Sequence, residues 1–472
     1  MPGLAAFRSH LGTLLAEQAG SLRLPGAVCG VLLDGETVIA THGLANVATG
    51  VEVTADTLFQ IGSLSKLYTT TLVLQAHSAG VLALDEPVRS QLQEFSVGDP
   101  GATLEITPRH LLTHTSGIAG DHLLDTGAND DALQRYVATL AALGQAHAPD
   151  ESYSFCNTGF GVLGRMIEVC TGGTFDRSLR RRLTRPLGCT TTLMLPQHLL
   201  LRRVAVGHVQ RPGEEPTRQP RWTLTRANGP MGGIVATAED VLTFARMHLE
   251  SGVAVDGTEI VPPAAVELMA EPHLDTPIPG ERQALGWTVW QWGDATCLGQ
   301  DADTFGQRAF LRVVPSRGFA LVLLTNSPLG ATLARGLVPR VAADLLDLDA
   351  TPALAGPGTS GAAGAAAADP GAPLPDAERF AGTYARLHQR IVVAADPEGP
   401  TLTATIEPSG VLAKLGSRHA EVRLRPLDPE RGVFALTDPA TGVDELAVFD
   451  RGDGTDPCRT LHLDGRLHRR WT

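Results

Sequence analysis

The chain has 472 residues with 43% hydrophobic content, which is enough for two or three domains with large buried cores and excludes general disorder. Its formal net charge of -13 argues against nonspecific binding to nucleic acid or to an anionic membrane. No apolar run reaches the ~18 residues of a membrane span, and residues 1–8 lack a signal-peptide pattern, so the sequence predicts a cytoplasmic protein.

The first predicted elements are two strands, residues 26–33 and 37–40, joined by a turn at Asp34-Gly35. Helical patterns dominate from about residue 60 to 250. A late hairpin follows, in which 310–314 pairs with 319–324 around residues 315–318. This order predicts an α+β fold, with an antiparallel sheet packed by helices beside an all-helical subdomain.

The most informative motif is Ser63-Leu64-Ser65-Lys66, an S-x-x-K element. A serine hydroxyl is a poor nucleophile until another group takes its proton. If Ser63 starts a helix, Lys66 lies one turn on and its amine can point back at the hydroxyl. An apolar pattern that stops at Gly80 predicts such a helix, whose N-terminus favours an oxyanion beside the serine. Alone, the motif also fits a serine cap followed by a solvated lysine.

Three further segments accompany this motif, namely ITPRHLLTHTSG at 106–117, NTGFGVLG at 157–164, and a glycine turn leading into a capped helix at 229–241. With Ser63 and Lys66, they resemble the serine β-lactamase and penicillin-binding-protein superfamily, on the side of class C β-lactamases, D-peptidases and related esterases. The match runs from about residue 25 to 345. It implies a β-lactamase-like fold and acyl transfer through an acyl-enzyme on Ser63.

The resemblance also assigns roles to other residues. Lys66, if burial makes it neutral, is the base within reach of Ser63. Asn157 is expected to hold the substrate's amide or to orient the Lys66 amine, although it also fits a turn residue that caps the next helix. The family's oxyanion hole uses the nucleophile's own N–H and one from the strand after the third motif. These donors correspond to Ser63 and Asp303.

Two family motifs are altered in this chain. The usual Tyr-x-Asn reads Phe155-Cys156-Asn157, so the phenol that serves in proton transfer is missing, and Tyr153 is the nearest phenol. The third motif, usually Lys or His with a small residue and Gly, reads Gln300-Asp301-Ala302-Asp303, so a titratable group has become a neutral amide. Phe155 and Gln300 leave open a noncatalytic ligand-binding protein. A β-lactamase or D-peptidase is a third hypothesis, disfavoured by the missing secretion signal and cationic motif.

The C-terminal part has a different composition. Residues 355–375 are almost all Ala, Gly and Pro, which predicts a linker, so the domains are predicted at 1–350, 351–375 (linker) and 376–472. The last domain opens on an F-x-G-x-Y motif at 380–384 and continues in short alternating segments, typical of an eight-stranded barrel or a sandwich. The motif resembles lipocalin-like barrels appended to some serine hydrolases of the superfamily. The barrel is either ligand-binding or filled, in the latter case packed near the active-site rim.

The six scattered cysteines predict reduced thiols, with no disulfide framework and no metal site. No cofactor is expected. Cys156, beside the expected site, is interpreted as a small buried hydrophobe and His114 as a turn residue. The two-part plan resembles penicillin-binding-protein-type thioesterases and transacylases of natural-product pathways. That resemblance implies a small-molecule or peptidyl acyl donor, free or carried by a carrier protein, and either water or an amine as acceptor.

Overall fold

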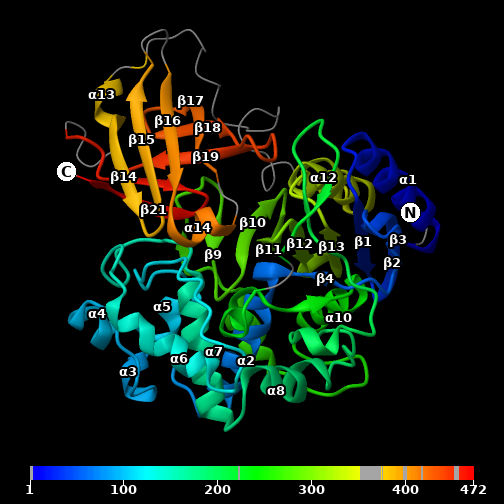
Figure 1. Cartoon of the computed structure of the whole chain (residues 1–472). Helices are drawn as coiled ribbons and strands as arrows, with labels where there is room; N and C mark the ends of the chain where they lie inside the picture. The colour runs from blue at the N-terminus through cyan, green and yellow to red at the C-terminus, as the bar shows by residue number, and fades with distance from the viewer. Residues whose placement is uncertain are drawn as a thin grey trace.

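The structure, a computed structural model, describes residues 4–221, 224–350, 374, 376–396, 401–415, 418–450 and 456–471. Almost all of the linker predicted at 351–375 lies outside the described residues. A nine-stranded sheet with its helices forms the main body, and a closed eight-stranded barrel forms the C-terminal domain (Figure 1). The predicted α+β fold class with a small all-β barrel is confirmed.

The main sheet is antiparallel, with the strand order β3-β2-β1-β13-β12-β11-β10-β9-β8. Both predicted hairpins are confirmed, as β1–β2 and β12–β13, and the two hairpins join because β1 pairs with β13. Asp34 and Gly35 take positive φ values of 49° and 82°, as a tight hairpin turn requires. The strands are β1 Gly26–Leu33, β2 Glu36–Asn46, β3 Val51–Glu52, β8 Leu274–Asp275, β9 Arg282–Gln283, β10 Thr288–Trp292, β11 Ala295–Thr304, β12 Gln307–Val314 and β13 Phe319–Thr325.

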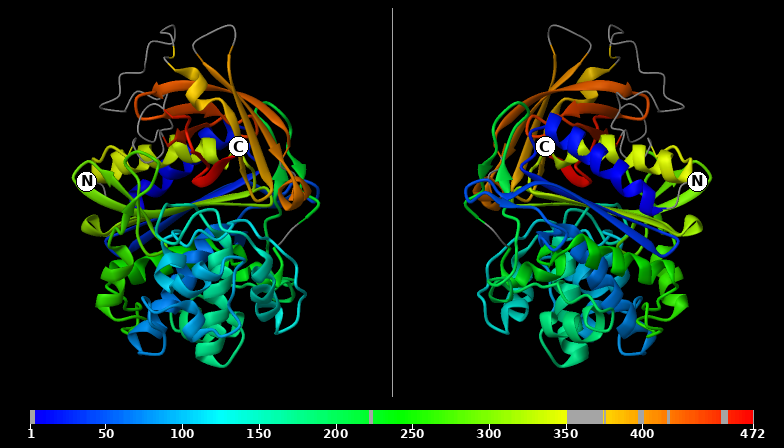
Figure 2. Two further views of the ribbon diagram at one scale, coloured as in Figure 1. Left: turned by 90° about the vertical axis from the view of Figure 1, so that its left-hand side faces the viewer. Right: turned by 90° about the vertical axis from the view of Figure 1, so that its right-hand side faces the viewer.

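Each face of this sheet is covered by helices. Alternate residues of a strand face opposite sides, so Cys29 packs in the core under α1 and α12 while Val28 packs in the larger core under the helical subdomain. Figure 2 shows the sheet between these two layers, with the barrel on the side of α1 and α12. The main-body helices are α1 Leu4–Ser21, α2 Ser65–Ser78, α3 Val88–Gln91, α4 Pro100–Glu105, α5 Pro108–Leu112, α6 Ala132–Thr139, α7 Asn157–Thr171, α8 Phe175–Leu179, α9 Gly229–Gly232, α10 Ala238–Leu249, α11 Pro263–Ala270 and α12 Gly330–Leu346.

Two short pairings lie beside the main sheet. Strand β4 (Phe59–Gln60) pairs with β7 (Val235–Ala236) and leads into the S-x-x-K motif, and β5 (His208–Val209) pairs with β6 (Thr217–Arg218). The helix expected after that motif is α2, which ends two residues before Gly80. Among the described residues, no helix combines the length and apolar character needed to cross a membrane.

The interior of the barrel is filled with side chains. Phe380, Tyr384, Phe434 and Phe449 pack edge to face, with ring centroids 5.0 to 5.5 Å apart. This packing favours the filled barrel over the ligand-binding one. The elements are α13 Ala377–Phe380, β14 Gly382–Arg386, β15 Gln389–Ala395, β16 Leu402–Pro408, α14 Gly410–Leu415, β17 Ala420–Asp428, β18 Val433–Thr437, β19 Asp444–Phe449, β20 Thr460–Leu463 and β21 Arg466–Trp471.

Candidate active site

Ser63 and Lys66 meet where the chain enters α2. Ser63 lies in a single 3-10 turn, Gly62–Leu64, and Lys66 lies in the first turn of α2. The Lys66 Nζ atom is 2.9 Å from Ser63 Oγ and donates to the Met231 carbonyl oxygen at 2.8 Å. The Lys66 side chain is fully buried, and no carboxylate among the described residues forms an ion pair with it. An amine held in this way by neutral oxygens has the position that a general base for Ser63 requires.

The environment of Lys66 favours its neutral form. Burial lowers the pKa of the Lys66 amine to about 7, and the positive charge of Arg466 acts in the same direction, whereas the Asp121 carboxylate opposes both. Near neutral pH the free base is therefore far more populated than it is for an exposed lysine. A free amine 2.9 Å from a hydroxyl can accept its proton during attack on an acyl carbon.

This pKa gives a testable pH dependence. Because the protonated amine cannot accept the Ser63 proton, we expect the acylation rate constant to rise with pH, with a midpoint near 7, and to level above about pH 8. Stopped-flow acylation with an activated ester between pH 5.5 and 8.5 measures this profile. A rate that is constant across this range would show that no group with this pKa acts as the base.

Strand β11 passes directly beside the nucleophile. Gly62 has a φ of 50°, and a Cβ atom there would lie 2.8 Å from Thr304 Cγ2 and 3.2 Å from Ala302 Cβ. Glycine therefore permits the close approach of β11 to the Ser63 turn. Gln60 Oε1 accepts a hydrogen bond from Thr304 Oγ1 at 2.8 Å and ties β4 to β11. Asp303 lies between Ala302 and Thr304 on this strand, and its backbone N–H stays the predicted second oxyanion donor.

Gln300 lies on the same strand, β11, and is buried. Its side chain is 4% exposed and shares a strand face with Ala302, which packs in the core of the helical subdomain. Its Oε1 atom is buried and has no hydrogen-bond partner within the described part of the chain. A buried amide oxygen that lacks a donor can accept an N–H from a bound substrate, but it cannot shuttle a proton.

Phe155 lies against the base, with its ring centroid 4.7 Å from Lys66 Nζ. His114 supports this segment, since its Nδ1 accepts a hydrogen bond from the Cys156 N–H at 2.9 Å and its ring centroid is 4.5 Å from that of Phe155. Burial lowers the pKa of His114 well below its usual range, so it is a neutral acceptor. Burial raises the pKa of the Cys156 thiol to about 11, which fits an unreactive packing residue.

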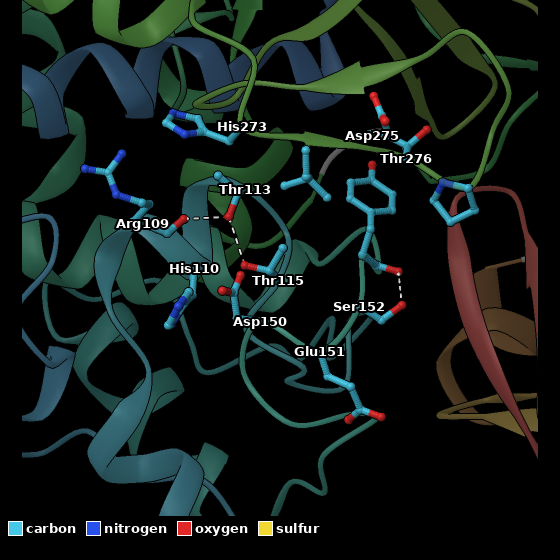
Figure 3. Close-up of a pocket in the computed structure, with 13 residues that line it drawn as sticks. Arg109, His110, Thr113, Thr115, Asp150, Glu151, Ser152, His273, Asp275 and Thr276 are labelled. Atoms are coloured by element: carbon cyan, nitrogen blue, oxygen red, sulfur yellow. Dashed lines mark hydrogen bonds between the residues drawn. The ribbon is translucent and has the colours of Figure 1, made fainter.

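Tyr153 packs against His114 and forms no hydrogen bond with Lys66 among the described residues. Its ring makes an edge contact with His114 at 5.9 Å. Tyr153 instead lines a neighbouring pocket of about 550 Å³ (Figure 3). The other lining residues are Arg109, His110, Thr113, Thr115, Asp150, Glu151, Ser152, His273, Leu274, Asp275, Thr276 and Pro277. The pocket thus adjoins the second motif and does not contain Ser63.

Asn157 is held by a carboxylate that the sequence did not indicate. Its Nδ2 atom donates to Asp121 Oδ1 at 2.8 Å. Asp121 is almost fully buried and also accepts hydrogen bonds from Arg386 at 2.7 Å and Arg466 at 2.8 Å, both from the barrel. Burial alone would raise the pKa of the Asp121 carboxyl, but Arg466 and Arg386 hold it far below its usual range. Sequence reasoning missed these three charged residues and the Met231 carbonyl.

Comparison with known proteins agrees with this geometry. The family model described as Beta-lactamase matches residues 11–345. The chain is 43% identical to "Penicillin-binding protein 4" of Amycolatopsis lactamdurans over 64% of this chain and 81% of that protein. It is 30% identical to "Esterase EstB" of Burkholderia gladioli over 39% of this chain and 50% of that protein. The crystal structures of SurE alone and with D-Leu superpose with TM-scores of 0.77 and 0.75, at 28% and 27% identity, over 99% of this chain and all of SurE.

Proposed function

This chain belongs to the beta-lactamase family of serine hydrolases, and from that membership we propose that it transfers an acyl group from an activated donor through an acyl-enzyme on Ser63. The donor is an ester, a thioester or a peptidyl thioester, free or presented by a carrier protein. The acceptor is water or an amine. We place the reaction in the cytoplasm, in the assembly of a natural product.

One observation carries this proposal. The fully buried Lys66 amine lies 2.9 Å from Ser63 Oγ, and its pKa is lowered to about 7 by burial. A nucleophile and a neutral base in hydrogen-bond contact are the minimum machinery of covalent acyl transfer. The beta-lactamase family match and the esterase relative support the reaction class.

The altered motifs favour an activated donor. An amine leaving group needs a proton from a general acid, whereas a thiolate or a good alkoxide leaves with little help. Phe155 stands against Lys66 without a hydroxyl, and Gln300 cannot supply a proton. Attack by Ser63 requires neither group. The site therefore suits thioesters and reactive esters better than amides.

The test presents one acyl group as a thioester, an ester and an anilide. We expect the thioester and ester to acylate Ser63 at least about 100-fold faster than the anilide, the size of a general-acid contribution. Intact-mass and peptide mass spectrometry locate the acyl group, and stopped-flow kinetics give the rates. Comparable rates for all three donors would contradict the leaving-group argument.

The same assay separates the alternatives. A noncatalytic ligand-binding protein, which Phe155 and Gln300 favour, would bind the donors without acylation. A β-lactamase or D-peptidase would turn over nitrocefin or a D-Ala-D-Ala peptide faster than the thioester. Because SurE was solved with D-Leu, we choose a D-leucyl thioester as the first donor to test, with the L-leucyl thioester as its stereochemical control.

A further inference from the structure

The hairpin between β20 and β21 of the barrel is docked on the second motif of the main body. The Phe155 N–H donates to the Gly465 carbonyl at 2.9 Å. The Leu467 N–H donates to Ser154 Oγ at 3.2 Å. Asp464 and Gly465 have positive φ values of 52° and 67° and form the tight turn at the tip. The barrel thus contacts Ser154 and Phe155, and Phe155 lies against Lys66.

Arg466 follows this turn and places its guanidinium inside the site. Its Nε atom donates to Asp121 at 2.8 Å, its Nη1 atom pairs with Asp464, and its side chain is 16% exposed. The Arg466 Cζ atom lies 5.0 Å from the centroid of the Phe155 ring, and Lys66 Nζ lies 4.7 Å from the same centroid. A permanent cation and the amine of the base therefore contact one aromatic ring.

Within the described residues, the charged and titratable groups that face Lys66 are Arg466, Asp121, Cys156 and His114. Burial keeps His114 neutral, and it also keeps the Cys156 thiol protonated at neutral pH. The negative charge of Asp121 is already paired with two guanidinium groups. Arg466 pairs with Asp121 and Asp464, and it is the cation that shares the Phe155 ring with Lys66. Its positive charge therefore disfavours a second positive charge on the Lys66 amine.

We propose that Arg466 is a positioning residue of acyl transfer: it clamps Asp121, and with it Asn157, and it holds a fixed positive charge beside Phe155, close to the Lys66 amine. The proposal rests on the function proposed above. It gives the barrel a part in the chemistry of a site that has no phenol in its second motif. Arg466 stays charged at every working pH, so the barrel places a constant positive charge near the Lys66 amine.

The composition of the chain offers a direct readout. The sequence contains only two lysines, Lys66 and Lys414. Full-length protein labelled with [ε-¹³C]lysine therefore gives two lysine side-chain resonances, and Lys66→Met assigns them. The chemical shift of the Lys66 resonance against pH gives its titration midpoint without any substrate, and Lys414 serves as the internal reference.

We expect Arg466→Gln to raise the Lys66 midpoint by about one pH unit, since it removes a unit charge within about 10 Å of the amine. The acylation rate at pH 7 should fall about fivefold as the neutral fraction shrinks. Arg466→Lys keeps the charge and should restore the wild-type midpoint. Arg386→Gln, the matched control, removes the other guanidinium from Asp121 and should shift the midpoint by less than half as much.

Asp464→Asn, at an exposed position, should shift the Lys66 titration midpoint in the opposite direction. It removes the carboxylate that pairs with Arg466, and asparagine tolerates the positive φ at this position. The Lys66 midpoint should fall by a few tenths of a pH unit, because the charge of Arg466 is then less compensated. If Arg466→Gln does not fold, this variant decides the proposal.

Two outcomes would overturn the proposal: an Arg466→Gln midpoint equal to that of the wild type, or an Arg386→Gln shift as large as that of Arg466→Gln. An unchanged midpoint in Asp464→Asn would do the same where Arg466→Gln is unfolded. Failure of the proposed function has a different signature. The wild-type Lys66 would then titrate near 7 and respond to Arg466, yet no donor would acylate Ser63.

Discussion

Ser63→Ala is expected to abolish acyl transfer, by on the order of 10⁵-fold, while the fold is kept. The Ser63 hydroxyl is the only one that contacts the Lys66 amine among the described residues, so no second nucleophile is in position. Ser63 is half-buried, and loss of its hydroxyl leaves little void. The melting temperature should therefore stay within about 3 °C of the wild type. Turnover of a thioester donor and thermal unfolding are measured together.

Ser65→Ala is the matched control within the same motif. Ser65 is fully buried, and its Oγ accepts a hydrogen bond from the Ile234 N–H at 3.1 Å, so its contribution is to stability. This variant should melt earlier and still form an acyl-enzyme on Ser63. Undiminished turnover in Ser63→Ala, or loss of acylation in a folded Ser65→Ala, would show that Ser63 is not the nucleophile.

The parts of the fold that local patterns encode were predictable. Asp34-Gly35 between two apolar runs marks a hairpin turn because both residues tolerate positive φ, and the structure has this hairpin. The alternating segments alone did not separate a barrel from a sandwich, and the barrel was predicted from the F-x-G-x-Y resemblance at 380–384. Alternating strands look the same in both, and closure depends on the pairing of β14 with β21, whose residues Thr383 and Trp471 are far apart in the chain.

In the candidate site, too, the residues close in sequence were predictable and those far apart were not. Ser63 and Lys66 are one turn apart, so the helix period alone brings them together. Asp121 and Arg466 lie 345 positions apart, and each reads in sequence as an ordinary solvated charge. Only the docking of the barrel hairpin buries this pair beside Asn157. Met231 contributes a backbone carbonyl, which leaves no side-chain signal, although the glycine turn around it was recognised.

The second motif shows that strand alternation alone does not predict where side chains point in this segment. Tyr153 and Phe155 are two residues apart, so an extended segment would direct both toward Lys66. In the structure, Phe155 contacts Lys66, while Tyr153 packs edge-on against His114 beside the adjoining pocket. The local geometry follows from contacts with His114 and with Gly465 of the barrel, and neither contact is visible in the segment itself.

Lys66→Met is expected to lower the acylation rate by about 10²- to 10⁴-fold, the usual contribution of a general base. Methionine has a similar length and no charge, so it fits the fully buried position without a desolvation penalty. The melting temperature should therefore be unchanged or higher. Burst kinetics with an activated ester measure the rate, and the pH dependence with a midpoint near 7 should vanish together with the amine.

The controls for this variant separate base catalysis from simple crowding of the site. Lys414→Met removes the only other lysine and should acylate like the wild type. If Lys66→Met acylated at the wild-type rate, the base would lie elsewhere, and Tyr153 would be the first residue to test. Burial raises the pKa of the Tyr153 phenol, so its basic form is scarce near pH 7. We therefore expect Tyr153→Phe, alone or added to Lys66→Met, to change acylation by less than about threefold, since a phenol that stays protonated accepts no proton from Ser63.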